Sequence, residues 1–280
     1  MSLPLPRRGF VNVIGGQVHY REAGQGGTRP LILLHPSPGS GKMLTPLLRQ
    51  MAQTRRTLAL DTRGNGDSTP LDRPEPEMAD FADAVLEALN GLGIERFDLF
   101  GSHTGASIAM ETAIQAPHRV ARLILDSMGL WSPQRREDYL ARNSPPIVPD
   151  LMGSQFNWAF HYCRDQYLFW PWYERTAEAR RPGGLPAPEI LHEFVVEVLK
   201  AYGSYHHSYR AAARHPKRER LPLITVPTLV TSSPTDMLIQ FLDEMAALVP
   251  GARKAVIADP ETEAGAAVAS PIYAAFLDDA

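Results

Sequence analysis

Three short polar turns hold the side chains best suited to catalysis. They are His35-Pro36-Ser37-Pro38-Gly39, Asp61-Thr62-Arg63-Gly64-Asn65-Gly66-Asp67-Ser68 and Gly101-Ser102-His103-Thr104-Gly105-Ala106. The third turn sets an imidazole beside a hydroxyl group. Histidine ordinarily ionises with a pKa of about 6.5, so the His103 ring is suited to accept or donate a proton near neutral pH.

Each turn directly follows a short apolar run, and stretches with helical spacing lie between the runs. Continuous apolar runs are typical of strands buried on both faces of a parallel sheet. The expected strands are Leu31–Leu34, Thr57–Leu60, Phe97–Phe100, Arg122–Leu125, Val226–Val230 and Ala255–Ala258, preceded by a hairpin that turns at Gly15-Gly16. Strands that alternate with helices predict a doubly wound, mostly parallel α/β sheet.

This alternation stops between Gly129 and about His215 and then resumes. The stretch between them is helical and rich in aromatic residues, which predicts a helical cap (lid) inserted over residues 131–215. Residues 1–130 and 216–280 then form the core, which is discontinuous in sequence.

Taken together, the three turns resemble motifs of the α/β-hydrolase superfamily. Its members carry H-G-x-P-G, D-x-R-G-x-G-x-S and the strand-turn-helix elbow G-x-S-x-G at these points. The resemblance spans almost the whole chain. It implies the α/β-hydrolase fold, a mostly parallel, doubly wound sheet with an inserted helical cap.

Two departures from the family pattern bear on the chemistry. The elbow reads Gly101-Ser102-His103-Thr104-Gly105, so a histidine stands at the apex where relatives carry the nucleophilic serine. Ser102 precedes the apex and should point another way, although a substrate-binding or nucleophilic role for it stays open. The family's general-base histidine is also missing, because no histidine follows His215.

The resemblance also ranks the acids that could orient His103. Asp236 occupies the family's acid position after the seventh core strand, although Asp is equally well suited there to cap the following helix. Glu261 and Glu263 lie in the loop where the family histidine would stand, and Asp126 is the acid position in some relatives. A carboxylate that accepts the ring N–H would fix the tautomer and stabilise the imidazolium.

The family's oxyanion hole corresponds to the backbone N–H groups of Ser37 and Thr104, and both residues carry one. In the cap, Arg164, Trp170 and Tyr173 are candidates for a pocket roof over an aromatic substrate, although aromatic residues at helical spacing also build a cap core. The pair His206-His207 offers at most one pocket-facing ring, His206 being the candidate, because adjacent helical residues point about 100° apart. We expect no metal site.

Composition narrows the class of protein further. The chain has 280 residues, a net charge of −3 and scattered basic residues, which argues against nucleic-acid binding. The charged run at 217–220 is expected to be a solvated turn. A single cysteine, Cys163, and the absence of a signal peptide or membrane span predict a cytoplasmic location. We expect a monomer or homodimer that acts on a small molecule without a cofactor.

The sequence therefore favours an enzyme in which His103, as general acid or base or by activating water, cleaves an ester, a lactone or a C–C bond of a small, aromatic substrate. Two alternatives remain open. One is a catalytically silent binding protein that kept the pocket. The other is a lyase or a cofactor-free dioxygenase, activities that relatives in this superfamily also display.

Overall fold

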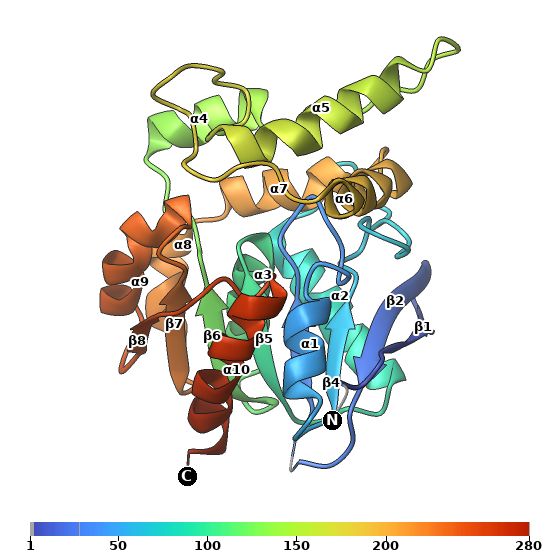
Figure 1. Cartoon of the computed structure of the whole chain (residues 1–280). Coiled ribbons are helices and arrows are strands. Elements are labelled where there is room, and N and C mark those ends of the chain that lie inside the picture. Colours follow the sequence, from blue (N-terminus) through green and yellow to red (C-terminus); the bar gives the residue numbers. More distant parts are fainter. Residues whose placement is uncertain (1–2, 28, 280) are drawn as a thin grey trace.

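An eight-stranded sheet organises the chain (Figure 1). The structure is a computed structural model, and it describes residues 3–27 and 29–279. The strand order is β1-β2-β4-β3-β5-β6-β7-β8. The pairs β1–β2 and β2–β4 are antiparallel, and the five remaining pairs are parallel. The predicted mostly parallel sheet is therefore confirmed.

The expected strands are all present, with ends that shift by a few residues. The strands are β1 (Arg7–Val13), β2 (Gly16–Ala23), β3 (Leu31–Leu34), β4 (Thr57–Leu60), β5 (Phe97–Ser102), β6 (Val120–Asp126), β7 (Thr228–Ser232) and β8 (Arg253–Val256). The helices are α1 (Thr45–Met51), α2 (Met78–Gly91), α3 (Thr104–Gln115), α4 (Pro133–Arg142), α5 (Ser154–Leu168), α6 (Pro188–Lys200), α7 (Tyr205–Arg214), α8 (Lys217–Arg220), α9 (Leu242–Leu248) and α10 (Glu263–Asp278), with 3₁₀ turns η1 (Leu221–Leu223) and η2 (Met237–Phe241).

The N-terminal hairpin turns one residue earlier than the sequence indicates. Val13 pairs with Gly16, so Ile14 and Gly15 form the turn and Gly16 already belongs to β2. Gly15 takes the left-handed backbone conformation, with φ of 75°. Glycine adopts that conformation without steric cost, which explains why the chain reverses there.

Both faces of the central strands are covered by apolar side chains. In β3, Ile32 and Leu34 pack into a cluster with side chains of α2 and α3, whereas Leu31 and Leu33 pack with those of α1 and α10. All four leucine and isoleucine side chains are buried. Because successive residues of a strand point to opposite faces, a strand covered on both sides needs an unbroken apolar run, as the sequence has here.

Residues 131–215, the inserted segment, form helices α4 to α7, which lie over the end of the sheet where the parallel strands finish (Figure 1). Helices α5 and α6 contact each other and share a buried cluster. Its members include Tyr162, Cys163, Leu191, Val198 and Tyr205. None of the described helices is long and apolar enough to cross a membrane.

The tight contact between the elbow and its neighbours allows a test of the fold. A Cβ atom on Gly101 would lie 2.2 Å from the Gly105 carbonyl oxygen, which is backbone and cannot move aside easily. Gly101→Ala should therefore lower the free energy of unfolding by about 2 kcal/mol or more. The matched control is Gly183→Ala, where an added Cβ meets nothing within 4 Å. Equal stability of the two variants in urea unfolding would contradict the elbow packing described here.

Candidate active site

The residue at the apex of the elbow is His103. Strand β5 ends at Ser102 and helix α3 begins at Thr104, so the chain reverses at a single residue. His103 has φ of 54° and ψ of −109°, a conformation that is costly for a residue with a side chain. Its backbone N–H donates to the Asp126 carbonyl oxygen at 2.9 Å, which holds the strained turn against β6.

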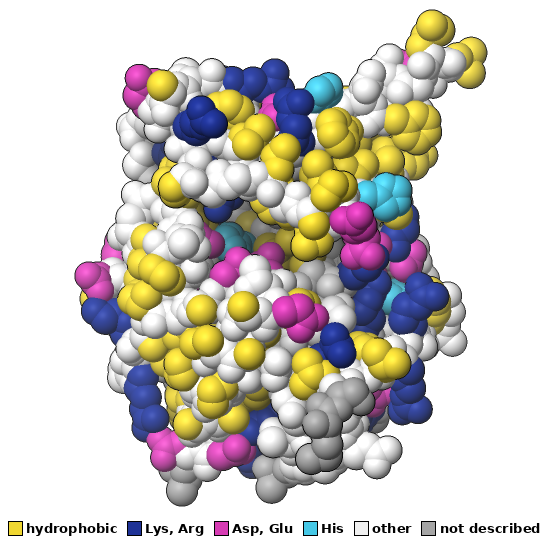
Figure 2. All heavy atoms as spheres, viewed as in Figure 1, with side chains coloured by type: hydrophobic (Ala, Val, Ile, Leu, Met, Phe, Trp, Pro, Cys, Tyr) yellow, Lys and Arg dark blue, Asp and Glu magenta, His cyan; other side chains and the backbone are white. Residues whose placement is uncertain are grey.

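The apex faces a cavity of about 360 Å³ between the sheet and the inserted segment. Figure 2 shows a hollow at this level, bordered by acidic side chains and with a histidine visible inside it. The strand ends and the loops after them contribute His103, Asp126, Asp236, Asp259 and Glu261, whereas the inserted segment contributes aromatic residues that include Trp131, Tyr139, Tyr167, Phe169, Trp170, Trp172 and Tyr209. The cavity thus has a charged floor and an aromatic roof.

The ring of His103 is bound to Asp236. Its Nε2 lies 2.8 Å from Asp236 Oδ2, and 32% of the His103 side chain is exposed. The other oxygen of Asp236 accepts the backbone N–H of Leu238 at 2.7 Å and caps η2. Asp236 therefore plays both roles that its position in the sequence suggests, helix cap and partner of the imidazole.

The second ring nitrogen of His103 begins a chain of buried hydrogen bonds. His103 Nδ1 lies 2.8 Å from Ser102 Oγ, and Ser102 Oγ donates to Asp126 Oδ2 at 3.1 Å. Thr231 Oγ1 donates to the other Asp126 oxygen at 2.8 Å. When Asp126 is ionised it can only accept, so Ser102 donates to it and accepts from Nδ1–H of His103. Both ring nitrogens of His103 then carry protons, as in an imidazolium.

The surroundings of His103 stabilise that charged form. Burial favours the neutral ring, but the charge and hydrogen bond of Asp236, with the charges of Glu261 and Asp126, outweigh it and raise the pKa of His103 to about 10. Burial likewise acts to raise the pKa of Asp236, yet His103 holds it below its ordinary value. The ring therefore does not titrate near 6.5, as its residue type alone suggests, because an ionised carboxylate contacts it.

Glu261 and Asp259 are both cavity-lining carboxyls in the loop between β8 and α10. Burial, followed by the charge of Asp259, raises the pKa of Glu261 to about 8. Burial also raises the pKa of Asp126 to about 7. Glu263 lies differently, since it begins α10 and pairs with Arg49 at 3.3 Å. The floor thus holds one charged imidazole and two carboxyl groups that ionise near neutral pH.

Two backbone N–H groups beside the apex could bind a developing oxyanion. Thr104 is the first residue of α3, so its N–H has no acceptor within the helix. Ser37 and Thr104 both line the cavity. The Ser37 hydroxyl is 2.7 Å from Ser208 Oγ on α7, which links the loop after β3 to the inserted segment.

Ser102 does not line the cavity, as its place before the apex predicts, and the substrate-binding role left open for it is therefore wrong. It is 0% exposed and lies beneath His103, bonded to that ring and to Asp126. At the end of a strand, neighbouring side chains point to opposite sides. Because the His103 side chain points into the cavity, the Ser102 side chain before it points into the protein.

Three residues expected at the pocket roof lie elsewhere in the described part of the chain, whereas Trp170 does line the cavity. Arg164 Nε donates to Asp165 at 2.8 Å, and the Tyr173 hydroxyl donates to Asp138 at 2.7 Å. The His206 ring packs edge-on against a neighbouring tyrosine, and burial lowers its pKa to about 4. The three side chains thus contact other residues of the inserted segment and stabilise it.

Lys217 lines the cavity, although the sequence indicates a solvated turn at this position. Its side chain is buried, whereas Arg218 and Arg220 of the same short helix pair with Glu244 and Glu111. A run of charges does not reveal which member points inward. Arg181, whose guanidinium donates to the Gln166 carbonyl oxygen at 2.8 Å, is a second lining cation without a signal in the sequence.

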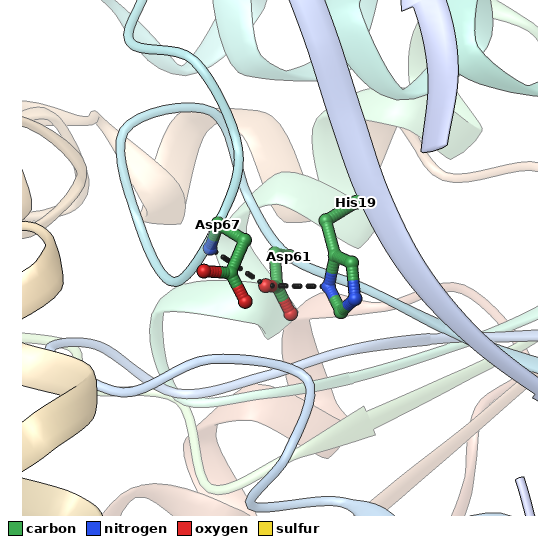
Figure 3. Close-up of side chains that lie close together, drawn as sticks. All are labelled: His19, Asp61 and Asp67. Carbon is green, nitrogen blue, oxygen red and sulfur yellow. Dashed lines mark hydrogen bonds and ion pairs between the residues drawn. The ribbon is translucent and has the colours of Figure 1, made fainter. Parts of the chain in front are cut away.

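A group of potential metal ligands lies apart from the cavity. Figure 3 shows His19, Asp61 and Asp67, whose ligand atoms lie within 4.8 Å of one another. Asp61 already accepts from His19 at 2.9 Å and from the Arg21 guanidinium at 3.0 Å, and Asp67 pairs with Lys200 at 2.8 Å. The charges of Arg21 and Lys200 offset those of the carboxylates, so the group forms a structural network, and we assign no metal to it.

Comparison with known proteins establishes the family. A family model of the alpha/beta hydrolase fold matches residues 29–263, so the chain belongs to the α/β-hydrolase fold family. Proline iminopeptidase of Lactobacillus helveticus is 26% identical over 260 residues, or 84% of this chain and 83% of that protein. Proline iminopeptidase of Heyndrickxia coagulans is 27% identical over a match that spans only 46% of each chain.

Solved structures show the same architecture. The enol-lactonase from Burkholderia xenovorans LB400 matches with a TM-score of 0.72 and 21% identity over 97% of this chain and 100% of that one. Epoxide hydrolase A from Mycobacterium thermoresistibile matches with a TM-score of 0.73 and 18% identity over 98% of each chain. At these identities the likeness is one of fold.

The burial of Ser102 leads to a test with serine-directed reagents. Phenylmethylsulfonyl fluoride should leave the protein unlabelled, because the Ser102 hydroxyl is covered and its proton is used on Asp126. Intact-mass measurement before and after treatment checks this, with Ser102→Ala as the matched control. A stoichiometric adduct that wild type forms and Ser102→Ala does not would overturn the placement.

Proposed function

We propose that this chain is a hydrolase with non-serine chemistry, in which His103 acts as general acid and base to cleave an ester, lactone or C–C bond of a small, aromatic substrate. The observation that carries the proposal is the 2.8 Å contact between His103 Nε2 and Asp236 at the elbow apex, on the cavity floor. A strained apex that points a partnered, titratable ring into a cavity is typical of a catalytic residue.

The charged form of His103 suits it to protonate the substrate. With a pKa of about 10, the ring is an imidazolium at neutral pH and can hydrogen-bond a carbonyl oxygen that becomes negative. Nδ1 is bonded to Ser102, so the substrate must share the Nε2 proton with Asp236. The N–H groups of Ser37 and Thr104 supply further donors to the same oxygen.

Glu261 completes the acid–base pair. While His103 is charged, another group must take the proton of the attacking water, and Glu261 lines the same cavity in the family's histidine position. Its pKa of about 8 makes the ionised carboxylate a stronger base than an ordinary glutamate. Water then attacks the carbonyl carbon as Glu261 accepts its proton, and the bond between that carbon and the leaving atom breaks as His103 protonates the leaving atom. Transfer of the proton from Glu261 to His103 restores the starting state.

The inserted segment supplies the substrate-binding cap in this proposal. Trp170 lies with its ring centroid 5.6 Å from that of Trp131, and both line the cavity. Flat apolar walls favour an aromatic or flat substrate, and a volume of about 360 Å³ sets its size at that of a small molecule. Residues 1–130 and 216–280 then form the catalytic core, and a cytoplasmic location remains a prediction.

A silent binding protein is the second candidate, and one observation favours it. Both nitrogens of His103 already have protein partners, so the network is complete without a substrate. In that case the cavity would bind a small molecule without turning it over.

The first activity prediction separates these two functions. On a panel of p-nitrophenyl esters, lactones and β-diketones, His103→Ala should lower kcat/KM by about 10²–10⁴-fold, the usual contribution of a general acid or base. His118→Ala, which removes an exposed histidine after α3, is the matched control and should retain the wild-type rate. Equal rates for both variants would place the chemistry elsewhere, and no turnover by wild type would favour the binding protein.

The second activity prediction concerns pH. The rate should rise through about pH 8 as Glu261 ionises and fall through about pH 10 as His103 loses its proton. Asp236→Asn removes the carboxylate that raises the pKa of His103, so the alkaline fall should move to lower pH. Glu263→Gln is the control for losing one carboxylate and should keep the wild-type profile. An alkaline limb that Asp236→Asn does not move would contradict the assignment.

A further inference from the structure

Lys217 has a buried amine at the cavity wall, and this amine takes no part in the proposed hydrolysis. Its residue is 7% exposed, and it lines the same cavity as His103. It belongs to α8, where the chain returns from the inserted segment to the sheet (Figure 1). Its Nζ donates to the Ala212 carbonyl oxygen at the end of α7.

The other lysines of the chain differ from Lys217 in their partners. Lys42 pairs with Glu193 at 3.2 Å, Lys200 pairs with Asp67 at 2.8 Å, and Lys254 pairs with Asp243. Across residues 3–27 and 29–279, Lys217 has no ion pair with a carboxylate. Lys217 is therefore the lysine whose positive charge the protein leaves uncompensated.

The surroundings of Lys217 favour its neutral form. Burial is the largest cause, and the guanidinium charges of Arg136 on α4 and Arg218 on α8 add to it, which lowers the pKa of Lys217 to about 7. A desolvated lysine beside other cations is the arrangement that makes an amine nucleophilic toward carbonyl carbon. Access is from the cavity, which Trp131, Tyr139 and Ala213 also line.

We propose that Lys217 is a covalent binding residue for small carbonyl compounds, aldehydes or 1,3-diketones, that enter the cavity. The amine nitrogen adds to the carbonyl carbon to give a carbinolamine, and the former carbonyl oxygen leaves as water with the two nitrogen-derived protons, which leaves a C=N bond. With a 1,3-diketone the imine tautomerises to a conjugated enaminone. No oxidant or further reactant is needed, and the step does not depend on His103.

Acetylacetone is the probe that tests this assignment. Wild-type protein incubated at neutral pH should gain the mass of acetylacetone less one water and develop enaminone absorbance. Peptide mapping should place the adduct on Lys217 at least about tenfold faster than on Lys42, Lys200 or Lys254, each of which is held in an ion pair with a carboxylate. The α-amino group, which also ionises near neutral pH, is mapped separately. An adduct spread evenly over the lysines, or absent from Lys217, would overturn the proposal.

Variants separate this reactivity from the proposed hydrolysis. Lys217→Arg keeps a cationic donor for the Ala212 carbonyl but cannot form an imine, so it should show neither the adduct nor the absorbance. Its thermal unfolding is measured alongside, and the peptide map of wild type decides the question even if this variant does not fold. His103→Ala should label like wild type, so a loss of hydrolysis with intact labelling would show two independent sites. Labelling that disappears with His103 would contradict the independent role of Lys217.

Discussion

The ion pair between His103 and Asp236 is the contact on which the site depends. It joins the turn after β5 to the turn after β7 across the cavity floor, at 2.8 Å. The backbone of His103 has a conformation that is costly for a residue with a side chain, and the ion pair fixes the ring at this position. The pair also keeps the ring charged. Through Ser102 the same ring reaches Asp126 and Thr231, so three parallel strands end in one hydrogen-bonded network.

The parallel sheet makes this convergence possible. Strands β5, β6 and β7 are neighbours in the sheet and run in the same direction, so the residues after each strand meet at one edge. The inserted segment then covers that edge with aromatic side chains. A single imidazole can thus be stabilised as a cation at the apex of the elbow.

The sequence predicts the fold well because short patterns of neighbouring residues identify the strands and turns. The unbroken apolar run of β3 needs two covered faces, and Gly101 and Gly105 allow the close elbow contact. It also ranks Asp236 first among the partners of His103. Local patterns could not show that Lys217 is buried or that Arg164, Tyr173 and His206 have partners outside the cavity, since those outcomes depend on contacts between distant segments. The raised pKa of His103 likewise comes chiefly from Asp236, with Glu261, and both lie more than 100 residues away along the chain.

The charge state of His103 is the central claim, and NMR of the imidazole measures it most directly. The chain has nine histidines, so the His103 ring signals are assigned as those missing from His103→Ala. Followed across pH in the free protein, the wild-type ring should stay protonated through neutral pH, with a midpoint near its pKa of about 10. A midpoint close to the ordinary histidine value of about 6.5 would mean that Asp236 does not hold the ring as an imidazolium, and the acid–base assignment would fall with it.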